Sequence, residues 1–232
     1  MNRIAILQSN YIPWKGYFDI INMADEFILY DDMQYTKNDW RNRNKIMTLA
    51  GMKWLSIPVR GKGKFGQKIN ETKVIDGKWV NRHWRSIQCN YAKAEYFQDY
   101  ADRIRAVYEA CRDEQYLSII NYKFIKEICS ILEIHTKITW SSDYTLADGK
   151  TERLVQLVKD AGGSHYLSGP AAKNYIQEEL FEQAGIVLEW MDYSGYPEYT
   201  QLSETFEHGV SILDLIFNEG PEAVKFLKST NI

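Results

Sequence analysis

The first thirty residues contain the pattern that most narrows the choice of fold. Residues 3–8 form an apolar run without helical periodicity, which indicates a buried strand. A polar loop with Pro13 follows, and apolar side chains then recur at helical spacing from Trp14 to Ala24. A second apolar run at residues 26–30 completes a strand–loop–helix–strand unit of the length that a βαβ unit needs. Such units build parallel sheets, in which ligands bind at the carboxyl ends of the strands.

The rest of the chain continues this alternation of strands and helices. Residues 45–49 and 52–59 predict a β-hairpin joined at Ala50 and Gly51, and residues 79–133 have helical periodicity. A helix capped by Asp148 is expected over residues 148–161, with further strands at 136–140, 164–167 and 186–190. The sequence therefore predicts one α/β domain over residues 1–232, with a mainly parallel, Rossmann-like sheet. Within it we expect a β-hairpin insertion at about 45–75 and a helical insert, or subdomain, at about 79–133.

Composition argues against a membrane protein, a disulfide framework and a metal site. The chain has no run of about 18 apolar residues, and its N-terminal apolar run is too short for a signal peptide. The three cysteines lie among apolar neighbours without a Cys-x-x-Cys pair, which is typical of reduced thiols in the cytosol. We therefore expect a cytoplasmic protein without an integral membrane segment and without a bound metal ion. The sequence leaves open whether the chain forms a homodimer.

Positive charge is concentrated in one segment. Residues 33–70 contain nine basic side chains and one acidic side chain, a net charge of +8, although the whole chain carries −3. A basic segment on an otherwise acidic chain favours a local anionic ligand over DNA, which a wholly basic domain would suit better. A solvated hairpin with charged edges would produce the same pattern. Part of this segment, residues 60–66, is glycine-rich and basic but lacks the spacing of a phosphate-binding P-loop.

The loop after the first strand is the first candidate for ligand contact. Gln8 and Tyr11 lie near the carboxyl end of that strand, where the N–H groups of the following helix favour an anion. Gly16, in the first helical turn, would let a ligand or another part of the chain approach closely. Trp14 and Phe18 are expected in the core instead. We therefore predict that Gln8 and Tyr11 bind substrate.

The end of the second strand carries the next set of polar residues. Asp31 and Asp32 could hold Mg²⁺ or a hydroxyl group, and Asp32 could act as a general base. Arg41 and Arg43 face the same side of an extended segment and could bind one phosphate or carboxylate together. The alternative is that the aspartates and arginines pair with one another across a loop. The predicted substrate contacts of this segment are Asp31, Gln34, Lys37, Arg41 and Arg43.

Two later segments complete the candidate site. His83 is the best general base by chemistry, because an unperturbed pKa near ~6.5 suits proton transfer at neutral pH. A lone histidine is nonetheless more often structural, and Asp32 is the competing base. Ser168 and Gly169 follow a short strand and open a helix, although an ordinary helix cap would look the same. We predict His83 and Asp32 as catalytic residues, and further substrate contacts from Tyr91, Ser168, Gly169 and Lys173.

These segments, taken in this order, resemble the WbqC-like family of bacterial polysaccharide-locus proteins. The most specific stretches are Gln8-x-x-Tyr11-x-Pro13-Trp14-x-Gly16-Tyr17-Phe18, Asp31-Asp32-x-Gln34-Tyr35-x-Lys37 and Trp40-x-Asn42-Arg43-Asn44. The resemblance continues through His83-Trp84 and Tyr166-Leu167-Ser168-Gly169-Pro170-Ala171, so it covers essentially the whole chain. One departure is Ser9, where the family usually has proline, and this difference could loosen the first loop.

The resemblance implies a role in O-antigen or capsule polysaccharide biosynthesis. It implies a transferase that attaches glycine or another acyl group to the amine of a nucleotide-linked amino sugar. The acyl donor would be an ATP-activated acid, an acyl-CoA or a charged tRNA. The competing hypothesis is a non-catalytic partner that binds a sugar nucleotide or a glycosyltransferase. The catalytic hypothesis predicts that six side chains converge on one cleft, namely Gln8, Asp32, Arg41, Arg43, His83 and Ser168.

Overall fold

The chain folds around a parallel five-stranded sheet. The computed structural model describes residues 1–61, 63–203 and 205–231. Within them, the sheet order is β5-β2-β1-β6-β7, and each neighbouring pair is parallel. The strands are β1 (Arg3–Leu7), β2 (Glu26–Leu29), β5 (Lys137–Trp140), β6 (His165–Ser168) and β7 (Val187–Trp190). The predicted α/β fold with a Rossmann-like parallel sheet is therefore confirmed.

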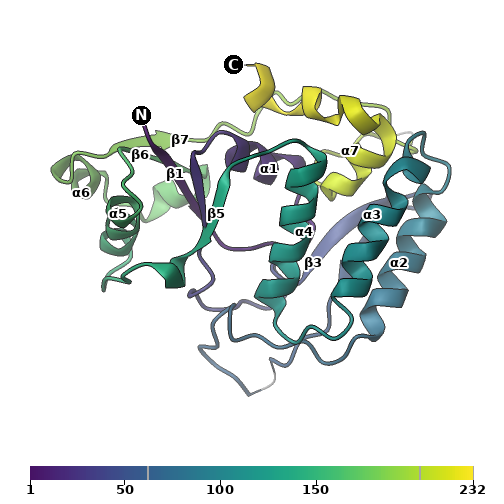
Figure 1. Ribbon diagram of the computed structural model, residues 1–232, viewed down its shortest axis with the longest axis horizontal. Coiled ribbons are helices and arrows are strands. Elements are labelled where there is room, and N and C mark those ends of the chain that lie inside the picture. The colour runs from purple at the N-terminus through teal and green to yellow at the C-terminus, as the bar shows by residue number, and fades with distance from the viewer. Residues whose placement is uncertain (62, 204, 232) are drawn as a thin grey trace.

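Helices cover both faces of this sheet (Figure 1). Helix α1 (Lys15–Asn22) follows β1, and its apolar side chains share one core with the sheet and with helix α4 (Leu117–Ile131). Helices α5 (Thr151–Asp160) and α6 (Glu178–Gln183) cover the opposite face, where Ile4 and Ile6 of β1 belong to a second core. Strand β1 alternates its side chains between the two cores, because successive residues of a strand point to opposite faces. The sheet is therefore wound on both sides.

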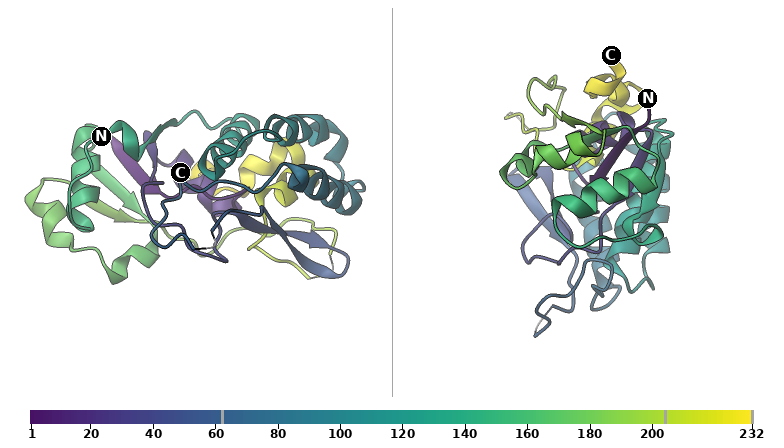
Figure 2. Two further views of the ribbon diagram at one scale, coloured as in Figure 1. Left: turned by 90° about the horizontal axis from the view of Figure 1, so that it is seen from below. Right: turned by 90° about the vertical axis from the view of Figure 1, so that its left-hand side faces the viewer.

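A hairpin and a group of helices lie between β2 and β5. The hairpin pairs β3 (Arg43–Thr48) with β4 (Gly51–Ser56) in antiparallel register. Helices α2 (Lys78–Tyr91) and α3 (Phe97–Ala110) follow it and pack beside α4 and α7 (Ile212–Glu219). Figure 2 shows these helices and the hairpin at one end of an elongated molecule, with the sheet at the other. Ala94 and Asp113 lie in the connections that separate α2, α3 and α4.

Several short helical turns differ from the expected boundaries. Helix α5 begins at Thr151 and its N-cap is Lys150, without a side-chain cap, so the prediction of Asp148 as cap was wrong. Gly149 lies between them with a φ of +87°, a conformation that turns the chain away from a helix. The segment after Gly169 forms a 3₁₀ helix (Pro170–Asn174) before α6. Other 3₁₀ helices are Ser141–Asp143, Gly220–Phe226 and Lys228–Asn231.

Lys62, counted in the basic segment, is outside the described residues.

The strand order creates a crevice at one edge of the sheet. Strand β1 has β2 on one side and β6 on the other, so the connections that leave β1 and β6 run to opposite faces. In doubly wound sheets, ligands bind in the crevice that opens between the carboxyl ends of two such strands. In this chain the crevice lies beyond Leu7 of β1 and Ser168 of β6.

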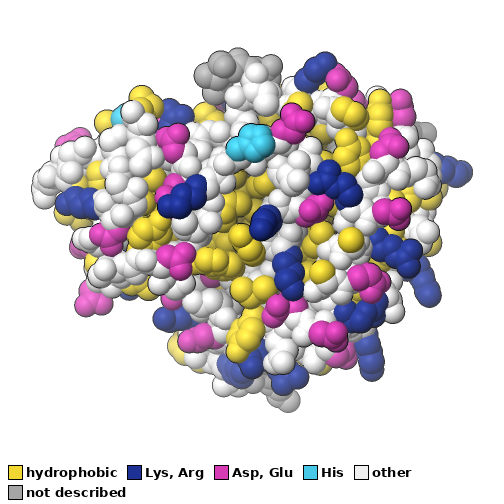
Figure 3. Space-filling model, viewed as in Figure 1, with side chains coloured by type: hydrophobic (Ala, Val, Ile, Leu, Met, Phe, Trp, Pro, Cys, Tyr) yellow, Lys and Arg dark blue, Asp and Glu magenta, His cyan; other side chains and the backbone are white. Residues whose placement is uncertain are grey.

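The surface shown in Figure 3 has no single-sign patch. On that face, basic and acidic side chains of the described residues are interspersed around a central group of exposed apolar side chains. Every helix of the described residues is too short or too polar to cross a lipid bilayer.

Candidate functional site

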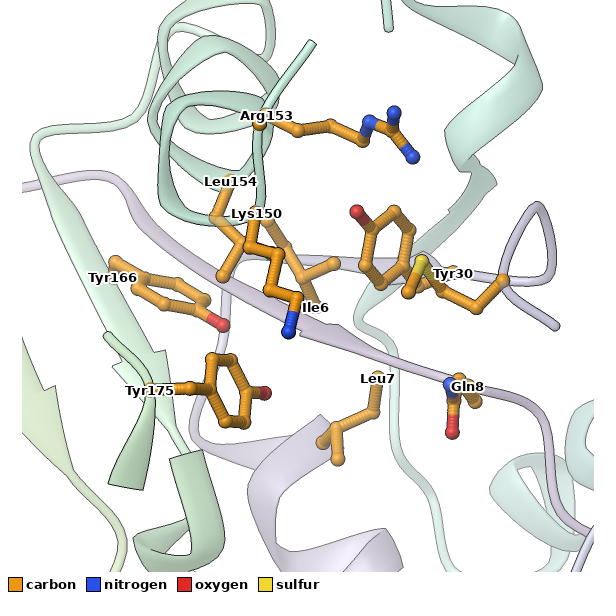
Figure 4. A pocket seen from close by; sticks show the side chains of 11 residues that line it. Ile6, Leu7, Gln8, Tyr30, Lys150, Arg153, Leu154, Tyr166 and Tyr175 are labelled. Atoms are coloured by element: carbon orange, nitrogen blue, oxygen red, sulfur yellow. The ribbon is translucent and has the colours of Figure 1, made fainter. Parts of the chain in front are cut away.

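A cleft opens at the carboxyl edge of the sheet, beside β1 and β6. Its volume is about 640 Å³, within the range of small-molecule sites. Eleven residues line it, and we call it the switch-point cleft: Ile6, Leu7, Gln8, Tyr30, Met33, Gly149, Lys150, Arg153, Leu154, Tyr166 and Tyr175. They come from the ends of β1, β2 and β6, from the start of α5 and from the turn after β6 (Figure 4). The cleft therefore lies where a doubly wound sheet binds its ligand.

Two cations of helix α5 face this cleft. The ammonium group of Lys150 has no hydrogen-bond or ion-pair partner among the described residues, and the Nε of Arg153 donates to the carbonyl oxygen of Ala147 at 2.7 Å. The cleft-lining residues include no aspartate or glutamate. Because both cations lie at the first turn of α5, the positive end of that helix adds to their field. The arrangement suits a ligand with at least one phosphate or carboxylate group.

Three tyrosines supply flat apolar walls and hydroxyl groups. Figure 4 shows the ammonium group of Lys150 and the hydroxyl groups of Tyr166 and Tyr175 pointing into the same space. Burial raises the pKa of Tyr30, Tyr166 and Tyr175, so all three stay protonated at neutral pH. A protonated phenol donates a hydrogen bond while its ring stacks on an apolar or aromatic group. The cleft can therefore hold a ligand that combines an aromatic ring with an anion.

The loop between β1 and α1 is held rigidly beside the cleft. Ile12 has a φ of +37°, which is rare for a β-branched residue and costs about 1–3 kcal/mol of strain. The Asn44 amide donates to the carbonyl oxygens of Tyr11, at 3.1 Å, and Ile12, at 2.9 Å. The hydroxyl of Tyr17 donates to the carbonyl oxygen of Gln8 at 3.0 Å. These contacts fix the loop in a conformation that its own residues would not favour.

The acidic pair after β2 has a structural environment. Asp31 is buried and accepts hydrogen bonds from the N–H of Ser9, at 2.8 Å, and from the hydroxyl of Ser118. Burial raises the pKa of Asp31, which those hydrogen bonds oppose. Asp32 accepts from the hydroxyl of Ser141 at 2.6 Å and from the Asn70 amide at 3.2 Å, and lies 3.6 Å from the Lys68 ammonium group. Neither carboxylate lines the cleft.

The two arginines do not fork onto a shared anion site. Arg41 donates to the side chain of Asn10 and lies 3.7 Å from Asp39. Arg43 donates to the carbonyl oxygen of Asn38 and stacks on Trp54, with 4.1 Å from the guanidinium carbon to the ring centroid. The alternative prediction, that the arginines form ion pairs with Asp31 and Asp32, was also wrong, because Arg41 pairs with Asp39 and Arg43 contacts Asn38 and Trp54.

His83 lies in the interior and not at the cleft. Its side chain is only 5% exposed, and its two nitrogens contact the hydroxyl of Tyr11 at 2.8 Å and the carbonyl oxygen of Ser56 at 3.2 Å. The Tyr11 hydroxyl also meets that of Tyr108 at 2.6 Å. Burial lowers the pKa of His83 to about 4, so the imidazole is neutral at pH 7. His83 and Tyr11 therefore join α2 to the β1–α1 loop, and the structure contradicts a substrate contact for Tyr11.

The remaining predicted residues are dispersed. Tyr91 is buried, donates to Asp214 at 2.9 Å and accepts from the N–H of Met47 at 2.9 Å. Gln34 and Lys37 line a different cavity, beside the glycine-rich loop. Ser168 is buried and donates to Tyr166, and Gly169 faces Tyr193. Lys173 lies over the ring of Trp190, with 5.3 Å to its centroid.

The predicted convergence of six side chains on one cleft is therefore not observed. Of those six, only Gln8 lines the switch-point cleft. The close approach expected at Gly16 does occur, but the neighbour is the ring of Trp14, which a Cβ at this position would meet at 2.4 Å. Among the described residues, no group of three His, Cys, Asp or Glu side chains is placed to hold a metal ion.

The sequence-based prediction of the site missed Lys150, Arg153 and the cleft tyrosines. Lys150 and Arg153 follow Gly149 at the start of a helix that comes directly before a predicted strand. The first turn of α5 also contains Glu152, the acidic side chain that the positive helix end normally favours, so local composition gave no clear signal of an anion site.

Comparison with known proteins identifies the family of this chain and one close relative. The model of the WbqC-like protein family matches residues 8–226. The chain belongs to this family. A relative in Mycobacterium tuberculosis (strain ATCC 25618 / H37Rv), the uncharacterized protein Rv1507c, is 50% identical over 230 residues, which is 98% of each chain. No solved structure gives a significant match. The WbqC-like match includes Gln8, Lys150 and Arg153 of the cleft.

Proposed function

We propose that this WbqC-like protein is a cytoplasmic transferase of polysaccharide biosynthesis, such as that of O-antigen. It binds a nucleotide-linked amino sugar in the switch-point cleft and attaches glycine or another acyl group to the sugar's amine. The observation that carries the proposal is the pair Lys150 and Arg153, two cations without a carboxylate partner on a cleft walled by tyrosines. A nucleoside diphosphate has the matching chemistry, because its phosphates meet the cations and its base meets the rings.

Acyl transfer needs positioned substrates more than a reactive protein side chain. The amine nitrogen forms a bond to the acyl carbon, and the bond from that carbon to the donor's leaving group breaks. The leaving group is a phosphate of an adenylate, the sulfur of CoA or a ribose oxygen of tRNA, and it takes up the proton that the amine loses. Holding both substrates in line is itself a large part of such a rate enhancement. The rigid β1–α1 loop beside the cleft would help to hold the sugar nucleotide in this way.

A second candidate function is a non-catalytic protein that binds a sugar nucleotide or a glycosyltransferase in the same pathway. The observation that favours it is the position of the two predicted catalytic side chains. His83 is buried and hydrogen-bonded, and both oxygens of Asp32 are engaged by protein groups. Neither lines the cleft.

A mass-shift assay separates the two functions. The purified protein is incubated with a panel of nucleotide-linked amino sugars and, in separate reactions, with ATP, Mg²⁺ and glycine, with acetyl-CoA, or with glycyl-tRNA. The transferase produces an adduct whose mass equals the sugar nucleotide plus the acyl group. Binding of a sugar nucleotide without an adduct from any donor supports the partner protein. If no sugar nucleotide binds, the transferase proposal fails and only a protein that binds a glycosyltransferase is left.

A further inference from the structure

A second cavity adjoins the β1–α1 loop. Its volume is about 330 Å³, and its lining includes Asn10, Pro13, Trp14, Trp40, Asn44 and His208. We call it the tryptophan pocket. Gln8 lines the switch-point cleft and Asn10 lines this pocket, so the Cα atoms of these two wall residues lie within about 7 Å of each other. The same rigid loop is therefore a common wall of both cavities.

Two indole rings give this pocket apolar walls. Trp40 is 40% exposed and contacts Trp54, with 5.3 Å between the ring centroids. Trp14 lies on the backbone of Gly16, and its other neighbours are the rings of Tyr193 and Tyr196 at 5.3 and 5.7 Å. Trp14 is therefore held in place by its surroundings. Trp40 is partly open, although the Lys45 ammonium group lies 5.9 Å from its ring centroid.

The polar groups that line the pocket are uncharged, and several of them have no hydrogen-bond partner among the described residues. The Asn10 oxygen accepts from Arg41, and its NH₂ group has no partner among the described residues. The Nδ1 of His208 is buried without a hydrogen-bond partner, and no described residue bonds its Nε2. Burial and the nearby Lys15 lower the pKa of His208, so the imidazole is neutral at pH 7 and can both donate and accept. No lysine, arginine, aspartate or glutamate is among the lining residues.

We propose that the tryptophan pocket binds an uncharged sugar ring, with its apolar face on Trp40 and its polar edge on Asn10 and His208. The pocket is at the lower end of the size range for ligand sites, which suits one ring better than a nucleotide. Its lack of cations separates it from the switch-point cleft, which suits phosphates. This inference rests on the proposed function for one step only, namely that the sugar belongs to the ligand whose diphosphate lies against Lys150 and Arg153.

The indole N–H signals of Trp14 and Trp40 in ¹⁵N-resolved NMR spectra report directly on this pocket. They are assigned with Trp14→Phe and Trp40→Phe, and the signal of the buried Trp79 serves as an internal reference. The probes are glucose, galactose and N-acetylglucosamine as free, uncharged sugars, and uridine as a nucleobase control. We expect at least one sugar, and not uridine, to shift the Trp40 signal in a saturable manner while the Trp79 signal stays unchanged.

Substitutions then tie the shift to the proposed contacts. His208→Ala is expected to weaken sugar binding at least tenfold, and His208→Gln, which keeps a hydrogen-bonding group, is expected to restore part of it. The matched control is His135→Ala, because His135 is exposed and lies outside the pocket. Equal affinity in the His208→Ala and control variants would overturn the assignment of His208.

The outcomes separate this inference from the proposed function. A saturable Trp40 shift with free sugar, in a protein that binds no sugar nucleotide, supports the tryptophan pocket and overturns the proposed function. Binding of a sugar nucleotide without a Trp40 shift from any free sugar, or a shift with uridine alone, overturns the sugar site and leaves the proposed function standing.

Discussion

The imidazole of His83 shows how burial decides the role of a single residue. Its Nδ1 and Nε2 atoms both have hydrogen-bond partners inside the protein, and its ring lies edge-on to Trp79 at 5.3 Å. Protonating this ring would place a charge in the interior, where desolvation disfavours it. The residue therefore contributes to stability through its neutral form.

This assignment predicts a specific pH dependence of stability. The pKa of His83 is about 4 in the folded protein and about 6.5 when unfolded, so the unfolded state binds more protons between these values. Its contribution to the free energy of unfolding is therefore complete above pH 6.5 and falls by up to about 3 kcal/mol as the pH drops to 4. Urea denaturation at pH 7, 5.5 and 4.5 measures this change in the free energy of unfolding. His83→Gln should flatten this part of the profile, and the exposed-site control His135→Gln should not. Identical profiles for all three proteins would refute the assignment.

Gly16 gives a second prediction at the residue scale. A Cβ at this position would lie 2.4 Å from the Trp14 ring, so Gly16→Ala forces that ring to move. We expect a loss of about 1–3 kcal/mol in the free energy of unfolding and a displaced Trp14 indole N–H signal. Chemical denaturation and the NMR spectrum measure the two effects. Gly61→Ala is the control, because a Cβ there meets no atom within 4 Å. A stable variant with an unmoved Trp14 signal would contradict the packing described.

The β1–α1 loop is the element that joins the two cavities. It contains the strained Ile12, and its carbonyl oxygens at Tyr11 and Ile12 depend on one side chain, Asn44 of β3. The N–H of Tyr11 donates to the carbonyl oxygen of Trp40 at 3.0 Å, which attaches the loop to the segment before the hairpin. The hairpin therefore supports the loop, although only Trp40 and Asn44 of this region line the tryptophan pocket.

Removing the Asn44 amide tests this support. Asn44→Ala leaves two buried carbonyl oxygens without donors, and we expect it to lower the free energy of unfolding by about 1–3 kcal/mol. We also expect weaker binding of a nucleotide-linked amino sugar, because the loop can then leave its strained conformation. Thermal unfolding and calorimetric titration measure the two effects. Asn174→Ala, at an exposed position, is the control. Unchanged affinity in a destabilised Asn44→Ala protein would show that loop rigidity does not matter for binding.

At the scale of the whole molecule, the local sequence pattern predicts the strands and helices but not which of them pack side by side. The apolar runs that became β1 and β2 are visible in the sequence because a central strand buried on both faces must be apolar, whereas the edge strands β5 and β7 are only partly buried. The carboxyl end of β1 correctly indicated Gln8 as a cleft residue. Strand β6 pairs with β1 although the two strands are far apart in the sequence. This pairing brings Lys150 and Arg153, which precede β6, to the carboxyl end of β1. No local pattern contains that information.

The sequence also does not predict which groups the polar side chains contact. Tyr11 and Asp31 belong to polar stretches typical of a binding site, yet Tyr11 contacts His83 of α2 and Tyr108 of α3, and Asp31 accepts from Ser118 of α4. These partners lie far along the chain. Whether a polar group meets a ligand or another protein group depends on that packing. Tyr11, Asn44 and His83 therefore hold the β1–α1 loop in place, and the cations of the cleft come from the start of α5.

Calorimetric titration of a nucleotide-linked amino sugar is the most direct test of the central claim, that Lys150 and Arg153 form an anion site in the switch-point cleft. The wild-type protein is compared with the double variant Lys150→Ala/Arg153→Ala and with Lys159→Ala, an exposed lysine of the same helix. We predict wild-type binding that weakens with added salt, a loss of at least tenfold in the double variant, and no change in Lys159→Ala. Equal affinity in all three proteins, with the double variant folded, would contradict the account.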